Sequence, residues 1–380
     1  MRDLGPAATE WPLVPLDAMD EQAARRVAAR TRVVVTTVGP YLKYGAALVA
    51  ACAEEGTHYC DITGELIFVH RAIAEHHETA ERTGARIVPA CGFDSVPSDL
   101  GVLLTAEAAR ADGAELGTTR LAVRSMRGGV GGGTIDTVRT QVDEFKNDHS
   151  ARAVMRDPWA LAEGGRPPRP ETTDAGNEPA GSGWAGIGGV LDRVVKASPV
   201  RRDADNGHFT GPFVMAAFNT RIVARSASLL EYGPRFRYVE YSDYGSGATG
   251  VVRATAVSAG LVAGLAGMAF PPTRMVLDRV LPKPGEAPDE EAQAKGRFRF
   301  EITAEASNGA RYRTTVAAPY DPGFSGTAIM LGQCALALVE DGDQLPDAAG
   351  VLTPATAIGV PLADRLRAHR FTLETERLPG

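Results

Sequence analysis

Buried-looking strands alternate with amphipathic helices over roughly the first 115 residues. Residues 32–38, RVVVTTV, are apolar throughout, which predicts a strand covered on both faces, as in a parallel sheet. A short strand is predicted over 11–17, followed by a helix with Asp17 as N-cap and Met19 on its apolar face. The later elements are predicted as a helix over 45–56, a strand over 57–62, a helix over 66–83 and a strand over 85–90. This alternation predicts a doubly wound, Rossmann-type α/β sheet.

Three of these strands end in loops that carry candidate functional residues. The loops read TTVGPY (36–41), DITGE (61–65) and ACGFDS (90–95). Ligands of such sheets bind beyond the carboxyl ends of the strands, so the loops are predicted to share one rim. Gly39 would let the backbone approach a flat ring, and Tyr41 offers an aromatic face with a hydroxyl, which suits a nicotinamide. The alternative is that Gly39 and Pro40 merely end the strand while Tyr41 packs under the next helix.

A dinucleotide site also calls for a Gly-rich turn at a helix N-terminus, where backbone amides bind the pyrophosphate. No such turn precedes residue 32, and two G-x-G-x-x-G matches occur later, at 181–186 and 245–250. The first lies in the Gly- and Pro-rich stretch 163–189, which has the composition of a mobile loop. The second follows 235–244, which alternates like a half-exposed antiparallel strand. Neither match is predicted to bind a dinucleotide.

Composition narrows the class of protein. The 380 residues are 44% hydrophobic and 23% charged, enough for one large or two packed domains. The net charge of −7 and the scattered basic residues argue against a nucleic-acid partner. Four irregularly spaced cysteines without a C-x-x-C pair, and His70, His76 and His77 without i, i+4 spacing, predict neither a disulfide framework nor a metal site. The start has no apolar run of a secretory signal, so a cytoplasmic protein is expected.

Several sequence blocks together carry a family resemblance. In chain order they are VVVTTVGPYLKYG, THYCDITGE, ACGFDSVPSDLG, PYDPGFSGTAIMLGQ and GVLTPATAIG. They resemble the saccharopine dehydrogenase-like oxidoreductases, specifically the trans-acting enoyl reductases that serve polyketide-derived lipid assembly. The resemblance implies a Rossmann domain, an inserted α/β substrate domain, and NADP as cofactor, with NAD left open. It also implies reduction of a C=C bond in a lipid-linked or polyketide-type acyl substrate.

One departure from the family is visible at the start. Its members begin with a strand, a Gly-rich turn, a helix and a second strand, which have no counterpart before 11–17. We therefore expect that about 50 to 70 residues of the natural start, the size of a βαβ unit and slightly more, are missing. The rival interpretation is a non-catalytic lipid- or protein-binding member that has lost its dinucleotide-binding half.

The candidate site residues follow from the rim loops. Hydride chemistry relies chiefly on the cofactor, with the protein supplying position and at most a proton donor. Tyr41 and Asp94 are the candidates for that donor, although Asp94 or Ser95 could instead cap the next helix. Cys91 lacks a His-Asp partner and is not predicted to be a nucleophile. The predicted cofactor-binding residues are Asp17, Thr37, Val38, Gly39, Pro40, Tyr41, Gly64, Glu65, Cys91, Gly92 and Phe93.

The middle of the chain is predicted to be the substrate domain. Residues 116–344 are assigned to an α+β insertion with antiparallel strands, and 1–115 with 345–380 to the nucleotide-binding domain. Asn308-Gly309 between alternating segments predicts a hairpin. Substrate-binding residues are predicted at a glycine loop leading into a helix and on one helical stripe: Gly132, Gly133, Thr134, Asn219 and Ser226. The alternatives are a flexible turn for the loop and a solvated shoulder of a core helix for the stripe.

Residues 254–270 are seventeen uncharged residues ended by prolines. They are marginally short for a membrane span, so a buried or lipid-facing helix is predicted, with the core helix favoured. Gly260 and Gly264 would allow close packing in either setting. Peripheral membrane contact through this helix and a homodimer are left open.

Overall fold

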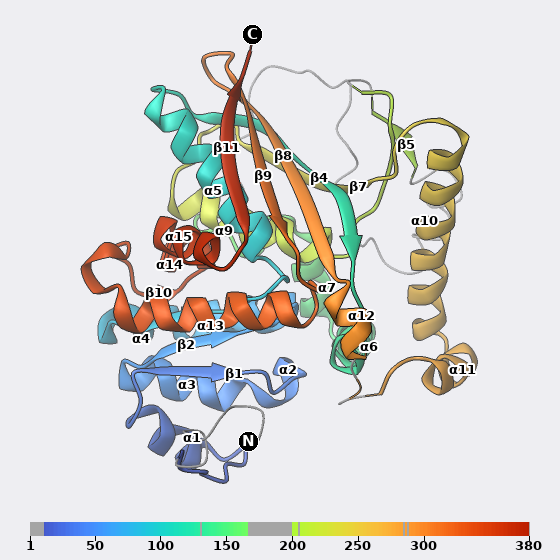
Figure 1. Ribbon diagram of the computed structural model, residues 1–380. Coiled ribbons are helices and arrows are strands. Elements are labelled where there is room, and N and C mark those ends of the chain that lie inside the picture. Colours follow the sequence, from blue (N-terminus) through green and yellow to red (C-terminus); the bar gives the residue numbers. More distant parts are fainter. Residues whose placement is uncertain are drawn as a thin grey trace.

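Two sheets organise the computed structural model, which describes residues 11–129, 131–165, 200–203, 206–283, 286 and 289–379 (Figure 1). A four-stranded parallel sheet has the order β1-β2-β3-β10, and a seven-stranded mixed sheet has the order β11-β9-β8-β4-β7-β6-β5. The predicted fold class, a parallel α/β sheet joined to a domain with antiparallel strands, is confirmed. The G-x-G-x-x-G match at 181–186 lies outside the described residues.

The parallel sheet and its helices come from the two ends of the chain. The first part contains α1 (Glu21–Ala28), β1 (Val33–Thr36), α2 (Tyr41–Tyr44), α3 (Ala46–Glu55), β2 (His58–Asp61), α4 (Leu66–Thr83), β3 (Arg86–Val88) and α5 (Val96–Ala111). The second part contains β10 (Gly350–Val351), α14 (Pro354–Ala357) and α15 (Val360–Ala368). The helices predicted over 45–56 and 66–83, and the strands over 57–62 and 85–90, are confirmed.

Most of the remaining elements are the strands of the seven-stranded sheet and the helices around it. These are β4 (Leu116–Arg127), α6 (Gly132–Asn147), α7 (His149–Arg156), β5 (Arg201–Arg202), β6 (Phe209–Gly211), α9 (Ala216–Leu229), β7 (Arg237–Asp243), α10 (Gly247–Ala269), α11 (Pro271–Val280), α12 (Glu290–Ala294), β8 (Arg297–Ala306), β9 (Arg311–Ala318), α13 (Ser325–Glu340), a 3-10 helix (Gly342–Gln344) and β11 (Thr372–Leu378). β8 and β9 form the predicted hairpin, and Gly309 adopts the positive φ of 80° that its turn requires.

Two predictions at the N-terminal end are wrong. No strand forms over 11–17, because Pro12 and Pro15 offer no backbone N–H for a ladder and no described strand lies beside them. Helix α1 is capped by Asp20, whose carboxylate accepts from Ala23 N, whereas Asp17 only closes a turn to Met19 N.

β1 exists as predicted and is partly covered on both faces, because Val33 packs against one core cluster and Val34 against the other. It is an edge strand among the described residues, and Val35 is 44% exposed. The next strand, β2, behaves as predicted: Tyr59 packs with α3 and α4, while its neighbour Cys60 packs into the core on the other face, beside α13.

Helix α5 joins the two sheets. Twelve of its sixteen residues are buried, and it packs against β4, β8, β9 and β11 on one side and α9 and α14 on the other. The predicted domain boundary changes at the C-terminal end: β10 joins the parallel sheet, but β11 pairs antiparallel with β9. Conversely, α13, from the predicted insertion, packs on β1 and β2 (Figure 1).

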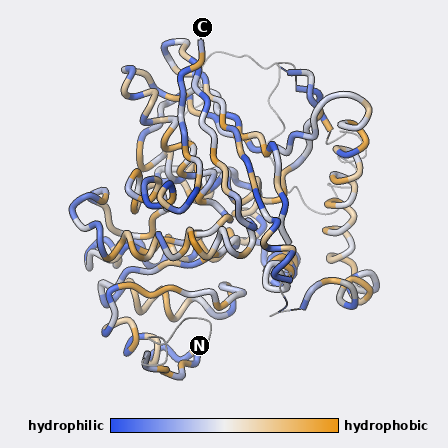
Figure 2. Tube along the Cα trace, viewed as in Figure 1, coloured by the Kyte–Doolittle hydropathy of each residue, from blue (hydrophilic) through white to orange (hydrophobic). Residues whose placement is uncertain are grey.

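Helix α10 is the clearest departure from the sequence prediction. Instead of lying in a core, it forms a largely hydrophobic arm at the side of the seven-stranded sheet, with Val251, Val252 and Val257 exposed (Figures 1 and 2). In the described part of the chain it is the one helix whose length and composition would allow it to cross a membrane, and only 17% of its apolar window is buried. Periodicity cannot reveal this arrangement because an almost uniformly apolar helix does not mark which side faces the protein.

Candidate active site

A buried glutamate ties the first two rim loops together. Glu65 is fully buried, and its two carboxylate oxygens accept the backbone N–H groups of Tyr41 and Leu42 at 2.8 and 2.9 Å. Burial raises the Glu65 pKa, while these two N–H groups oppose that rise by stabilising the charged form. The hydroxyl of Thr137 on α6 also reaches Glu65, at 3.4 Å, which brings the predicted substrate domain to the same rim.

A buried aspartate ties the second loop to the third. Asp61 accepts from Tyr59 OH at 2.8 Å and from the backbone N–H groups of Thr63 and Ala90, both at 2.9 Å. Its side chain is fully buried, and desolvation raises its pKa to about 7. Hydrogen bonds at each junction therefore hold the three loops together, and the predicted shared rim is what the structure shows.

Tyr41 is built into this rim rather than displayed on it. Its ring packs beside Phe68 with centroids 5.6 Å apart, and the side chain is 4% exposed. The hydroxyl donates to Thr36 O at 3.2 Å and accepts from Ile62 N at 3.3 Å. Burial raises the Tyr41 pKa well above its usual value. This geometry favours the packing alternative for Tyr41, and a catalytic role for it stays a prediction.

Asp94, unlike Tyr41, has a polar group that is not hydrogen-bonded to the other rim loops. Its half-buried carboxylate lies beside two glycines: a Cβ on Gly64 would be 3.5 Å from Oδ1, and a Cβ on Gly92 would be 3.0 Å from Oδ2. Among the described residues, no other side chain donates a hydrogen bond to it. Desolvation raises its pKa to about 7, and the nearby charge of Asp61 adds to the rise. Asp94 is therefore a rim carboxyl group with a raised pKa that no other described side chain bonds.

The capping alternative for Asp94 and Ser95 is not observed. Ser95 occupies the N-cap of α5 but makes no side-chain capping bond, and its hydroxyl donates instead to Asn219 Oδ1 at 3.0 Å.

The remaining predicted cofactor residues divide by position. Thr37, Val38 and Gly39 are exposed at the end of β1, with Val38 53% exposed, whereas Pro40 is buried. The Phe93 N–H donates to Thr327 Oγ1 at 3.0 Å. Cys91 is buried, its thiol donates to Val88 O, and burial raises its pKa. The Asp17 side chain, by contrast, is exposed and bonded to Met19 N, with no hydrogen bond to the rim.

The predicted substrate-binding residues also include both buried and exposed positions. Gly132 is buried, while Gly133 and Thr134 are exposed at the start of α6, one turn before Thr137. Their substrate contacts stay predictions.

The pocket position predicted for Asn219 and Ser226 is wrong. They are 1% and 0% exposed. Asn219 donates to Glu240 at 3.1 Å, and Ser226 donates to Asp99 at 2.5 Å. Both residues join α9 to neighbouring elements inside the core.

Sequence reasoning missed the residues of other elements that lie beside the rim loops. The Thr327 hydroxyl on α13 accepts from Phe93 N at 3.0 Å, and Met215 Cε lies 3.5 Å from the position of a Gly64 Cβ. Thr327 belongs to one of the blocks that carry the family resemblance, PYDPGFSGTAIMLGQ, which was a usable signal. Met215 had none, because its position depends on how α9 packs.

The rim fits a flat, hydride-carrying ring. Gly39 and Gly64 present bare backbone, Val38 presents an exposed apolar side chain, and Asp94 adds an uncommitted carboxyl group. Nowhere in the described residues do three or more His, Cys, Asp or Glu side chains gather as metal ligands would. A parallel sheet with this rim, joined to a second large sheet, defines a Rossmann-type oxidoreductase.

Comparisons with known proteins identify the family. A Mycobacterium tuberculosis protein assigned to the trans-acting enoyl reductases is 43% identical over 382 residues, covering 99% of this chain and 87% of that relative. The trans-acting enoyl reductases of Mycobacterium bovis and Mycobacterium ulcerans are 42% and 39% identical, with the same coverage. No family model matches the chain. The protein belongs to the trans-acting enoyl reductase family, which confirms the resemblance seen in the sequence.

A solved structure supports the fold. Saccharopine dehydrogenase (L-Glu forming) from Saccharomyces cerevisiae superposes with a TM-score of 0.50 at 12% identity, covering 96% of this chain and 89% of the yeast chain. The protein is thus an oxidoreductase with the saccharopine dehydrogenase-like fold.

Proposed function

We propose that this protein reduces the C=C bond of an enoyl group on a lipid- or polyketide-type substrate, with NADPH as the hydride donor. The observation that carries the proposal is the uncommitted Asp94 carboxyl, with a pKa of about 7, at the rim of three strand ends. Family membership supports the reaction, because the relatives are named enoyl reductases. The preference for NADP over NAD rests on the family resemblance alone. The name of the relatives also supports delivery of the substrate in trans, on a separate synthase.

The chain's own residues then have distinct roles. Bound NADPH supplies the hydride, and reduction of a conjugated C=C bond also requires one proton at the neighbouring carbon. Protonated Asp94 donates that proton, and Gly64 places no side chain beside its carboxyl group. Glu65 and Asp61 do not compete for this role, because their oxygens already accept hydrogen bonds that hold the loops.

The proposal is tested by titrating the 380-residue protein with NADPH and with NADH while following nicotinamide fluorescence. An enoyl thioester is then added, and loss of the reduced cofactor is followed. We expect saturable binding, tighter for NADPH, and one cofactor oxidised per double bond reduced. Absence of saturable binding for either cofactor would contradict the proposal and favour a non-catalytic lipid- or protein-binding role.

We further propose that α10 rests on a lipid surface. Its 23 residues contain one charged side chain, Arg253, although most of the helix is exposed. At its far end, Phe270 and Met275 are 60% and 63% exposed, and the basic residues Arg279 and Lys283 follow, which suits an anionic membrane surface.

Substituting both exposed tip residues, Phe270→Ser with Met275→Ser, should weaken membrane partitioning about tenfold, because each loses apolar area that the lipid would bury. Flotation with anionic phospholipid vesicles measures the effect. Met126→Ser, at a 48% exposed position on β4, is the matched control and should partition like the wild type. Equal partitioning of all three proteins would contradict a lipid-facing α10.

A further inference from the structure

A cavity of about 340 Å³ lies on the seven-stranded sheet, and none of its lining residues belongs to the rim. It is lined by Arg124, His208, Asp243, Tyr244, Gly245 and Arg253. Arg124 points into it because Val123, the preceding residue on β4, faces the core on the other side of the sheet. The remaining lining residues come from the segment before β6, from the end of β7 and from α10. The volume is in the range of small-ligand sites.

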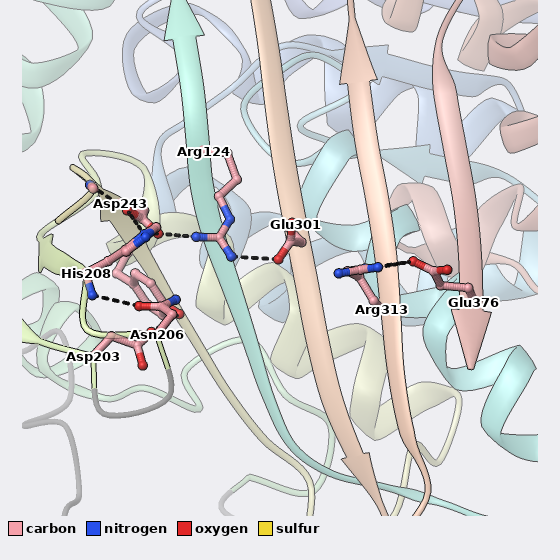
Figure 3. Close-up of polar contacts among 10 residues, drawn as sticks. Arg124, Asp203, Asn206, His208, Asp243, Glu301, Arg313 and Glu376 are labelled. Atoms are coloured by element: carbon pink, nitrogen blue, oxygen red, sulfur yellow. Dashed lines mark hydrogen bonds and ion pairs between the residues drawn. The ribbon is translucent and has the colours of Figure 1, made fainter. Parts of the chain in front are cut away.

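The single carboxylate in the cavity wall, Asp243, already accepts hydrogen bonds with both of its oxygens. Asp243 is 4% exposed, and its Oδ1 accepts from Gly245 N at 2.8 Å and contacts His208 Nδ1 at 3.0 Å. Its Oδ2 accepts from Arg124 and also contacts His208 Nδ1 (Figure 3). Asp243 therefore fixes the positions of an imidazole and a guanidinium rather than presenting an acceptor to a ligand.

The groups that remain free are hydrogen-bond donors. Arg124 bonds Asp243 and Glu301 through its two terminal nitrogens, which leaves Nε and one hydrogen on each terminal nitrogen (Figure 3). The Nδ1–H of His208 donates to the Asp243 carboxylate, so this imidazole is held at the side of the cavity and is not counted among the free donors. Arg253 is exposed and forms no ion pair with the described residues, so all five of its N–H groups are available. Arg124 is balanced by Asp243 and Glu301, so Arg253 is the lining cation that has no ion pair among the described residues.

We propose that this cavity binds a phosphate group, either free or as an ester. The free guanidinium fork of Arg253 and the remaining N–H groups of Arg124 line one small space, and together they match the several oxygens of a phosphate better than a neutral ligand. The backbone supports this choice: β7 runs through Tyr244 and Gly245 directly into α10, whose N-terminal end adds a favourable partial charge. The 245–250 glycine motif thus lies beside the cavity, between a strand and a helix. β7, expected to be purely antiparallel, pairs in parallel with β4 and antiparallel with β6.

Titration calorimetry with inorganic phosphate, at an ionic strength held constant with chloride, tests the proposal on the full chain. We expect saturable binding at one site, weakened about tenfold in Arg253→Gln, which loses charge-assisted hydrogen bonds without disturbing an ion pair of the described residues. Arg235→Gln, in the loop between α9 and β7, is the matched control: it removes the same charge at an exposed position outside the cavity, and should bind like the wild type.

Methyl phosphate and dimethyl phosphate separate the sources of the ligand. Tighter binding of the diester would support a phosphodiester such as a lipid headgroup, and tighter binding of inorganic phosphate or the monoester would support a free phosphate or a phosphomonoester. Absence of saturable binding for all three probes would overturn the proposal. Equal weakening in Arg253→Gln and Arg235→Gln would overturn it too, because it would indicate only general attraction to a positive surface.

Discussion

The Asp94→Asn variant is expected to lose about 100- to 10,000-fold of the enoyl reduction rate while binding NADPH as tightly as the wild type. Asparagine has nearly the same size and shape but cannot donate a proton as an acid. No other described side chain bonds the Asp94 carboxyl, so the amide of asparagine leaves no side-chain partner without its hydrogen bond. Single-turnover oxidation of bound NADPH by an enoyl thioester measures the rate, and fluorescence titration measures cofactor affinity separately.

The pH dependence of the reduction rate provides a second test of the role of Asp94. Asp94 acts in its protonated form, and its pKa of about 7 lies well above that of an exposed aspartate. The wild-type rate should therefore be highest below pH 7 and fall about tenfold per pH unit above it, as one acid group ionises. The residual rate of Asp94→Asn should lack this step.

Tyr41→Phe is the contrasting control for the Asp94 assignment. It removes a hydroxyl that bonds Thr36 O and Ile62 N, so it should lower stability but reduce the rate less than tenfold. A loss in Tyr41→Phe as large as in Asp94→Asn, together with a flat wild-type pH profile, would assign the proton to Tyr41 instead.

The rim was predictable because its signals are local. A strand that ends in glycine, followed by a helix, is encoded within a few residues, and parallel strands place their ends at one edge whatever the rest of the fold does. Asp94 and Glu65 could therefore be found from their places in ACGFDS and DITGE. The pKa of Asp94 could not be predicted, because it depends on how deeply the folded chain buries its carboxyl group and on the charge of Asp61, which comes from another strand.

Predictions failed where the burial of a residue depends on a partner that is distant in the sequence. Asn219 and Ser226 share a helical stripe, but the sequence does not show that Glu240 on β7 and Asp99 on α5 close over them. From sequence alone, a polar residue that is hydrogen-bonded inside a core cannot be distinguished from one that binds a ligand. α10 fails for the opposite reason: its apolar residues predict burial, but nothing local shows that the protein body leaves most of that helix uncovered.

Glu65→Gln is expected to lower the free energy of unfolding by about 2 to 3 kcal/mol, a large fraction of the stability of an ordinary domain. The two Glu65 oxygens accept the N–H groups of Tyr41 and Leu42, and glutamine keeps only one acceptor. Its NH₂ group would face a buried N–H, donor against donor, and the first rim loop would separate from the second. We therefore expect weaker NADPH binding in the same variant.

Urea unfolding followed by circular dichroism measures the stability change, and nicotinamide fluorescence measures cofactor affinity. Thr137→Val is the matched control, because it removes only the 3.4 Å contact to Glu65 and leaves both backbone bonds in place. It should cost less than about 1 kcal/mol, since it deletes one weak hydrogen bond. If Glu65→Gln unfolds at the wild-type urea concentration yet binds NADPH poorly, Glu65 contacts the cofactor directly rather than holding the loops, because a bond that maintains the rim cannot be lost without a cost in stability.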